Sequence, residues 1–154
     1  MKDMKGIEAD SLAAWSTSAA LAAMTEKREL MVAVRPTFHE PAIFAKQAAN
    51  IDHISGGRLA LNVVSSWWAD EARRFGITFD EHDDRYARTE EWLKVVNGVW
   101  TESSFSFRGK YYSVDETIVE PKPFRKPRPT IYAGGEWEAA KRSEEHASNT
   151  QPPM

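Results

Sequence analysis

Three short apolar runs, separated by longer segments with helical spacing, constrain the fold of this chain most strongly. They span residues 30–34, 58–65 with an apolar core at 59–64, and 130–133. A short run that is apolar without alternation is typical of a strand buried on both faces, as in a parallel sheet. Parallel strands need crossover connections, which are usually helices. The sequence therefore predicts an α/β fold built in layers.

Helical segments are predicted wherever apolar residues recur three and four positions apart. Pro41 suits the first turn of such a segment, and Gly56 and Gly57 supply its stop. Asp83 or Asp84 is the expected N-cap of a later helix. The four predicted helices cover residues 11–25, 41–55, 84–100 and 136–148.

The segment between the third predicted helix and the last strand has a different period. Apolar and polar residues alternate over residues 105–113, around Arg108 and Gly109, which predicts a short β-hairpin. Four prolines between residues 121 and 129 then mark an extended connector that leads into the strand at 130–133.

These elements form a βα series whose closure three strands do not specify. A complete (β/α)8 TIM barrel usually needs ~250 residues, so about three of its eight units are represented here. We expect the chain to form an incomplete barrel of this kind with a β-hairpin insertion. The last predicted helix loses its pattern by Ser148, so we expect a frayed tail after it. A doubly wound open sheet is the alternative.

Composition excludes several function classes. The 154 residues carry a net charge of -3 without a Lys/Arg block, so bulk attraction to nucleic acid or an anionic membrane is not expected. The absence of cysteine excludes disulfides, thiolate catalysis and Cys-type zinc sites. His39 with Glu40, and His82 with the two aspartates that follow it, lack zinc-type spacing, so no metal is expected. With no apolar run near ~20 residues and no signal-peptide pattern, a cytoplasmic location is predicted.

Candidate site residues gather where the predicted strands end. Ligands of parallel α/β folds bind beyond the carboxyl ends of the strands. Gly134 and Gly135, between a strand and a helix, could receive a phosphate or merely make the turn. Arg85 and Tyr86 could contact the same anion or lie on the surface.

Asn62 is a primary amide within an apolar strand, and it either ties the fold together or recognises a polar heterocycle. Trp67 and Trp68 follow that strand and suit either a stacking surface or ordinary core and lid positions. Glu71, by itself, is a loop carboxylate.

Residues 30–71, 84–100, 105–114 and 120–136, taken in this order, resemble the bacterial luciferase-like monooxygenases. The closest branch resembles the alkanesulfonate and related FMNH2-dependent monooxygenases. The resemblance implies a βα barrel, of which residues 1–141 would be the incomplete central part and residues 142–154 an aberrant or disordered tail. Such a barrel uses reduced FMN from a separate NAD(P)H-dependent flavin reductase. It also implies that O2 and a small organic substrate, such as an organosulfur compound or alkanesulfonate, react there.

The family's cofactor-binding positions, carried over by this resemblance, fall on Asn62, Glu71, Arg85, Tyr86, Gly134, Gly135 and Glu136. Glu136 departs from the small residue usual in the family and would crowd or repel a phosphate. The catalytic residues of relatives lie outside this segment, so none is assigned.

Two alternatives accompany this interpretation. The chain could be an inactive truncated fragment of such an enzyme, or an F420-dependent oxidoreductase of the same superfamily. An unclosed parallel sheet would also expose edges and apolar faces, so we expect marginal stability or a homo-oligomer.

Overall fold

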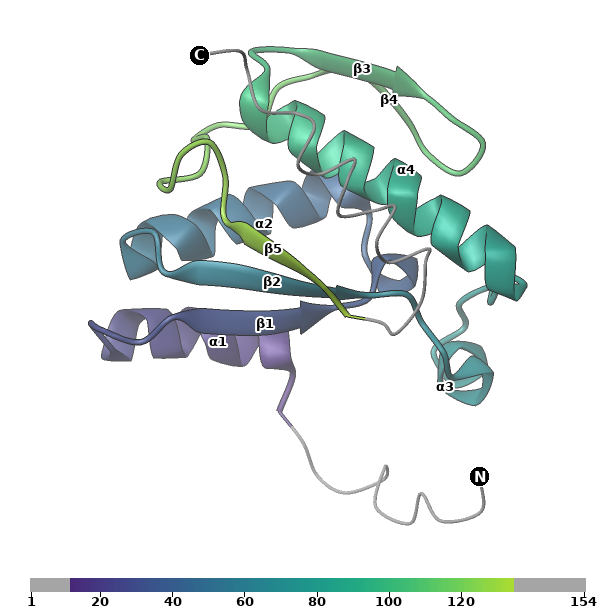
Figure 1. The fold of residues 1–154 in the computed structure, drawn as a ribbon, viewed down its shortest axis with the longest axis horizontal. Helices are drawn as coiled ribbons and strands as arrows, with labels where there is room; N and C mark the ends of the chain where they lie inside the picture. Colours follow the sequence, from purple (N-terminus) through teal and green to yellow (C-terminus); the bar gives the residue numbers. More distant parts are fainter. Residues whose placement is uncertain (1–11, 135–154) are drawn as a thin grey trace.

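A parallel sheet of three strands forms the centre of the chain. The computed structural model describes residues 12–134. Leu30–Val34 (β1), Leu59–Val64 (β2) and Thr130–Gly134 (β5) pair in the order β1-β2-β5. All three strands run in the same direction, so their carboxyl ends lie at one edge of the sheet (Figure 1). Phe105–Arg108 (β3) and Ser113–Thr117 (β4) form a separate antiparallel hairpin. The predicted parallel α/β core and the hairpin are confirmed.

The helices agree with the sequence in part. The third predicted helix begins two residues early, at His82, with Glu81 at the N-cap position in place of Asp83 or Asp84. A six-residue helix follows β2 where only a loop was expected, because so short a segment carries no readable period. The fourth predicted helix and the tail at 142–154 lie outside the described residues. The helices are Ala14–Met24 (α1), Pro41–Ser55 (α2), Ala69–Arg74 (α3) and His82–Thr101 (α4), with a 3-10 turn, η1, at Pro36–Phe38.

One face of the sheet carries the hydrophobic core. Alternate residues of β1 and β2 point toward α1, α2 and α4, and the burial of their apolar side chains is the main force that holds these layers together. The core includes Leu30, Val32, Val34, Leu59, Leu61 and Val63 from the strands and Ala22, Phe44, Ala48, Trp92, Val96 and Trp100 from the helices.

The opposite face of the sheet is open at its two outer strands, although Ala60 of the central strand β2 is buried there. The prediction that β1 is buried on both faces was therefore wrong. Met31 of β1 is 60% exposed, and Tyr132 of β5 is 44% exposed. No helix within residues 12–134 covers this second face. The alternate residues of β1, which point to the first face, are buried in the core under the helices. We call this the open face of the sheet.

Local sequence explains where α2 begins and ends. Pro41 occupies the first helical turn, where its missing N–H costs nothing. Gly56 follows the helix with φ 65°, a left-handed conformation that a Cβ would strain. The N–H of Gly57 donates to the carbonyl of Asp52 at 2.8 Å, which satisfies a carbonyl at the end of the helix.

The hairpin is held against α4 by a carboxylate and by a close approach. Glu91 of α4 accepts backbone N–H bonds from Lys110, Tyr111 and Tyr112 in the hairpin turn, at 2.8–3.2 Å. A Cβ on Gly98 would lie 2.3 Å from the ring of Phe105, so only glycine lets β3 approach the helix this closely.

No helix in residues 12–134 combines the length and the apolar character needed to cross a membrane.

Candidate functional site

The carboxyl ends of the three parallel strands bring the predicted site segments to one edge. Val34 pairs with Val63, and Val64 pairs with Gly134, so the strands end at nearly the same level. Arg35 therefore follows β1 at this edge, and Ser65 and Ser66 follow β2. This confirms the expectation that these strand ends share one edge of the sheet, where parallel α/β proteins bind ligands.

Asn62 lies on the open face near this edge. It pairs with Ala33 of β1 on one side and Tyr132 of β5 on the other. Its side chain is half-buried and forms no hydrogen bond with another described residue. The sequence left two interpretations of Asn62 open. Its geometry favours an amide that is available to a ligand over an amide that ties the strands together.

A hydroxyl chain joins the end of β2 to the first turns of α4. The hydroxyls of Ser65 and Thr89 are 2.9 Å apart, and Thr89 donates to the backbone carbonyl of Arg85 at 2.8 Å. The beginning of α4, and with it Arg85, is therefore held next to the carboxyl edge of the sheet.

Arg85 itself is half-buried and only partly engaged. Its Nη1 donates to the carbonyl of Asp80 at 2.8 Å, and its guanidinium stacks on the ring of Phe79 at 4.6 Å. Its Nε is buried and has no hydrogen-bond partner among residues 12–134. Tyr86 packs against the ring of His82, with centroids 4.9 Å apart. Arg85 therefore offers a positive charge and an unused donor to an anion.

Ser66 contributes a second unused group. Its side chain is 2% exposed, and its hydroxyl has no hydrogen-bond partner in the described part of the chain. A buried hydroxyl without a partner typically costs about 1–3 kcal/mol, so such a group is a candidate for contact with a ligand. The next two residues, Trp67 and Trp68, stack on each other with centroids 6.3 Å apart.

Glu71 is engaged by a residue that the sequence did not connect to it. Arg35, at the end of β1, donates to both carboxylate oxygens of Glu71 on α3, one of them at 2.9 Å, and its guanidinium stacks on Phe38. The pair is separated by 36 positions in the chain and depends on a helix that has no sequence signal. The charges of Arg35 and Glu71 therefore balance each other at this edge.

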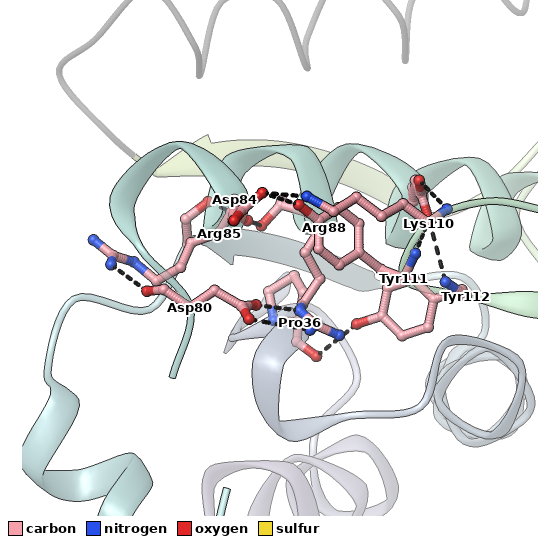
Figure 2. Close-up of polar contacts among 11 residues, drawn as sticks. Pro36, Asp80, Asp84, Arg85, Arg88, Lys110, Tyr111 and Tyr112 are labelled. Atoms are coloured by element: carbon pink, nitrogen blue, oxygen red, sulfur yellow. Dashed lines mark hydrogen bonds and ion pairs between the residues drawn. The ribbon is translucent and has the colours of Figure 1, made fainter. Parts of the chain in front are cut away.

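A further network holds the beginning of α4 to the hairpin (Figure 2). Arg88 of α4 pairs with the carboxylate of Asp80 at 2.5 Å and stacks on Tyr111 of the hairpin at 4.7 Å. Tyr111 also donates a hydrogen bond to Asp84, and Lys110 contacts the same carboxylate at 2.7 Å. These hydrogen bonds lower the pKa of Asp84, with Lys110 the larger cause.

Asp80 connects this network to the site, because its carbonyl accepts from Arg85 while its carboxylate holds Arg88. Sequence analysis did not single out Asp80 or Arg88, and a pair eight positions apart across a loop carries no local pattern that could have found it.

A match to a known family accompanies this geometry. Residues 3–151 match the family described as luciferase-like monooxygenase. This chain belongs to the luciferase-like monooxygenase family. The family resemblance predicted from the motif order is thereby confirmed.

Relatives of this luciferase-like chain include the FMNH(2)-dependent dimethylsulfone monooxygenase of Pseudomonas putida. The two are 44% identical over 124 residues, which is 80% of this chain and 34% of the relative. The chain thus spans about a third of the length of the curated relatives it matches.

Solved structures give the same fold. The monooxygenase RslO1 from Streptomyces bottropensis is 29% identical, with a TM-score of 0.72 over 79% of this chain and 36% of that one. DmoA from Hyphomicrobium sulfonivorans is 25% identical, with a TM-score of 0.73 over 88% and 34%.

The remaining predicted positions of the luciferase-like site are only partly described. Gly134 is the last residue of β5 and lies beside Val64 at the carboxyl edge. Gly135 and Glu136 lie outside the described residues. Within residues 12–134, no group of three or more His, Asp or Glu side chains is placed to hold a metal ion.

His39, just beyond η1, is expected to make the stability of the fold depend on pH. Burial, and secondarily the charge of Arg35, lower the pKa of His39 below 6.5. As the pH falls through 6.5, the unfolded chain binds this proton more readily than the folded chain, so stability falls. We expect the free energy of unfolding to decrease between pH 7.5 and pH 5.5, and to decrease less in His39→Phe.

Urea unfolding at both pH values measures this change in the free energy of unfolding. His82→Gln, at an exposed histidine, is the control, and equal decreases in all three proteins would contradict the assignment.

Proposed function

We propose that this chain forms the central part of the reduced-FMN site of an FMNH2-dependent monooxygenase that acts on a small organosulfur compound. The observation that carries the proposal is a set of polar groups at the carboxyl edge of the parallel sheet that have no hydrogen-bond partner among the residues that the structure describes. These groups are the amide of Asn62, the hydroxyl of Ser66 and the Nε of Arg85. The 44% identity to a dimethylsulfone monooxygenase named as FMNH2-dependent supports the same cofactor.

The described groups fit reduced FMN by their chemistry. Arg85 offers a positive charge and a buried, unused donor, which suits a phosphate. The proposed phosphate site would also include Tyr86 next to Arg85, Gly134 at the end of β5, and Gly135 and Glu136, which follow it in the sequence. Asn62 offers both a donor and an acceptor, which suits the polar edge of the isoalloxazine ring. Bound reduced FMN would supply the electrons that activate O2.

The substrate that fits best is uncharged. In the part of the chain that the structure describes, the guanidinium of Arg35 donates to both carboxylate oxygens of Glu71. The positive charge of Arg35 is therefore already neutralised and is not presented to a substrate. In this proposal Glu71 orients Arg35 and does not contact the cofactor itself. A sulfone, which has no charge, suits such an edge better than a sulfonate, which would need a cation of its own.

The sheet is proposed to be part of a luciferase-like (β/α)8 barrel, with residues 1–141 in the barrel and 142–154 as a separate tail. Closure of the barrel would cover the open face and exclude water from the flavin, and self-association would protect the sheet edges. Reduced FMN would come from a separate NAD(P)H-dependent reductase.

Binding of reduced FMN to the purified chain under anaerobic conditions tests the proposal, with quenching of tryptophan fluorescence as the readout. We expect Asn62→Ala and Arg85→Met each to weaken binding about tenfold or more, because each removes groups that would otherwise bond the ligand. Asn50→Ala on the outer side of α2 and Arg73→Met, whose side chain is 72% exposed, are the matched controls.

Each result has a definite meaning. Unchanged binding in both site variants would remove these two assignments. Absence of binding by the unmodified chain, with its circular dichroism intact, would favour the alternative of an inactive fragment.

A further inference from the structure

Tyr132 occupies the position on β5 that corresponds to Asn62 on β2. The register pairs Ala33, Asn62 and Tyr132 across the three strands, so these residues form one row. The preceding row, Val32, Leu61 and Ile131, packs into the core under the helices. Because successive side chains of a strand point to opposite faces, Tyr132 lies on the open face with Asn62.

The side chain of Tyr132 is available to a ligand. It is 44% exposed, although it stands in the middle of a strand at the centre of an apolar sequence run. Its hydroxyl forms no hydrogen bond with a described residue. On the other side of Asn62, Ala33 has only a methyl group and is itself exposed. The phenol therefore lies on the open face in the same row as the amide of Asn62.

Both residues are also close to the carboxyl edge of the sheet. Gly134 follows Tyr132 by two positions on the same strand, and Val64 follows Asn62 by two on its own, so the pair lies at one depth below the edge. Neighbouring strands are about 4.8 Å apart, which places an amide and a phenol side by side along one line. A planar heterocycle with alternating carbonyl and N–H groups along one edge matches that spacing.

From this juxtaposition we infer that Tyr132 is a second polar contact to the ring of the flavin, beside Asn62. The inference rests on the proposed function and deepens it. The phenol O–H donates to a ring carbonyl, and the amide of Asn62 binds the adjacent ring atoms. Tyr132 therefore contacts the flavin ring, whereas Arg85 at the beginning of α4 binds the phosphate.

Tyr132→Phe tests this inference, because it removes one hydroxyl and keeps the aromatic ring and its packing. We expect the affinity for reduced FMN to fall about three- to tenfold, the usual effect of one hydrogen bond. Thr130→Val is the matched control, since it removes a hydroxyl from the same strand and the same face two rows further from the edge. Its affinity should stay within about twofold of the unmodified chain.

Reduced riboflavin, which has no phosphate, separates a ring contact from a phosphate contact. Tyr132→Phe should weaken riboflavin binding by the same factor as FMN binding, whereas Arg85→Met should weaken FMN binding much more than riboflavin binding. A loss with FMN that disappears with riboflavin would overturn the ring contact. Unchanged binding of both ligands by Tyr132→Phe, with Asn62→Ala still impaired, would overturn this inference and leave the proposed function standing. Unchanged binding in all site variants, Asn62→Ala and Arg85→Met included, would overturn both.

Discussion

Replacement of Trp92 by alanine is expected to lower the free energy of unfolding by about 3–5 kcal/mol, the usual cost of removing a large buried aromatic side chain. Trp92 is fully buried in α4, and its ring packs on Phe44 of α2 with centroids 4.7 Å apart. Its indole N–H donates to the carbonyl of His39 at 2.8 Å. One side chain thus connects α4 and α2 to the segment that follows β1, so its loss leaves a cavity and an unpaired carbonyl together.

Urea unfolding followed by far-UV circular dichroism measures this loss without depending on tryptophan fluorescence. Trp92→Phe should cost less than Trp92→Ala, because it keeps most of the ring and gives up the indole hydrogen bond. Trp67→Ala is the control for tryptophan content, since Trp67 is 50% exposed and its loss should change stability by about 0.5 kcal/mol or less. Equal effects of Trp92→Ala and Trp67→Ala would show that Trp92 is not part of a tightly packed core.

Replacement of Arg58 by methionine is expected to have the second largest effect, a loss of about 2–4 kcal/mol for several charge-assisted hydrogen bonds removed at once. The guanidinium donates to the carbonyls of Ala22, Thr25 and Arg28, at 2.9, 2.6 and 2.8 Å. It also donates to the carbonyl of Ser55 at the end of α2, at 2.7 Å. Arg58 therefore satisfies the carbonyl end of α1 and holds it against α2 and the beginning of β2.

Arg58→Lys should recover little of this stability. The planar guanidinium of arginine donates in several directions at once, whereas the compact ammonium group of lysine cannot reach all of these carbonyls. Arg28→Met is the matched control, since Arg28 is exposed and contributes only its backbone carbonyl to the cluster. The same urea series compares the three variants. A stability of Arg58→Met equal to that of Arg28→Met would contradict the role given to this cluster.

The sheet and most helices could be predicted because their causes are local or periodic. β1 was predicted with its observed bounds because a run of apolar residues that ends at Pro36 leaves few other options. α2 was predicted because Pro41 and Gly56 mark its two ends by their own backbone preferences. α3 was missed because its six residues cover fewer than two turns, too few for a period to be read.

The site divides in the same way. Asn62, Arg85 and Gly134 could be chosen from the sequence because each is unusual for its position: a polar residue in an apolar strand, a cation at a helix start, a glycine where a strand ends. What surrounds them could not be predicted. Arg35 pairs with Glu71, and Arg88 pairs with Asp80. Each pair joins segments that are brought together only by the packing of the fold.

The sequence by itself determined the parallel βα order, the family and the edge at which the candidate site residues lie, because apolar periodicity and backbone preferences act over a few residues at a time. Only the tertiary structure decided which charges are already neutralised and which donors remain unused, as with Glu71 and Arg85. It also placed Tyr132 beside Asn62, through the register of two strands separated by more than sixty positions. Such pairings depend on the distances and directions that packing imposes, which no local stretch of sequence contains.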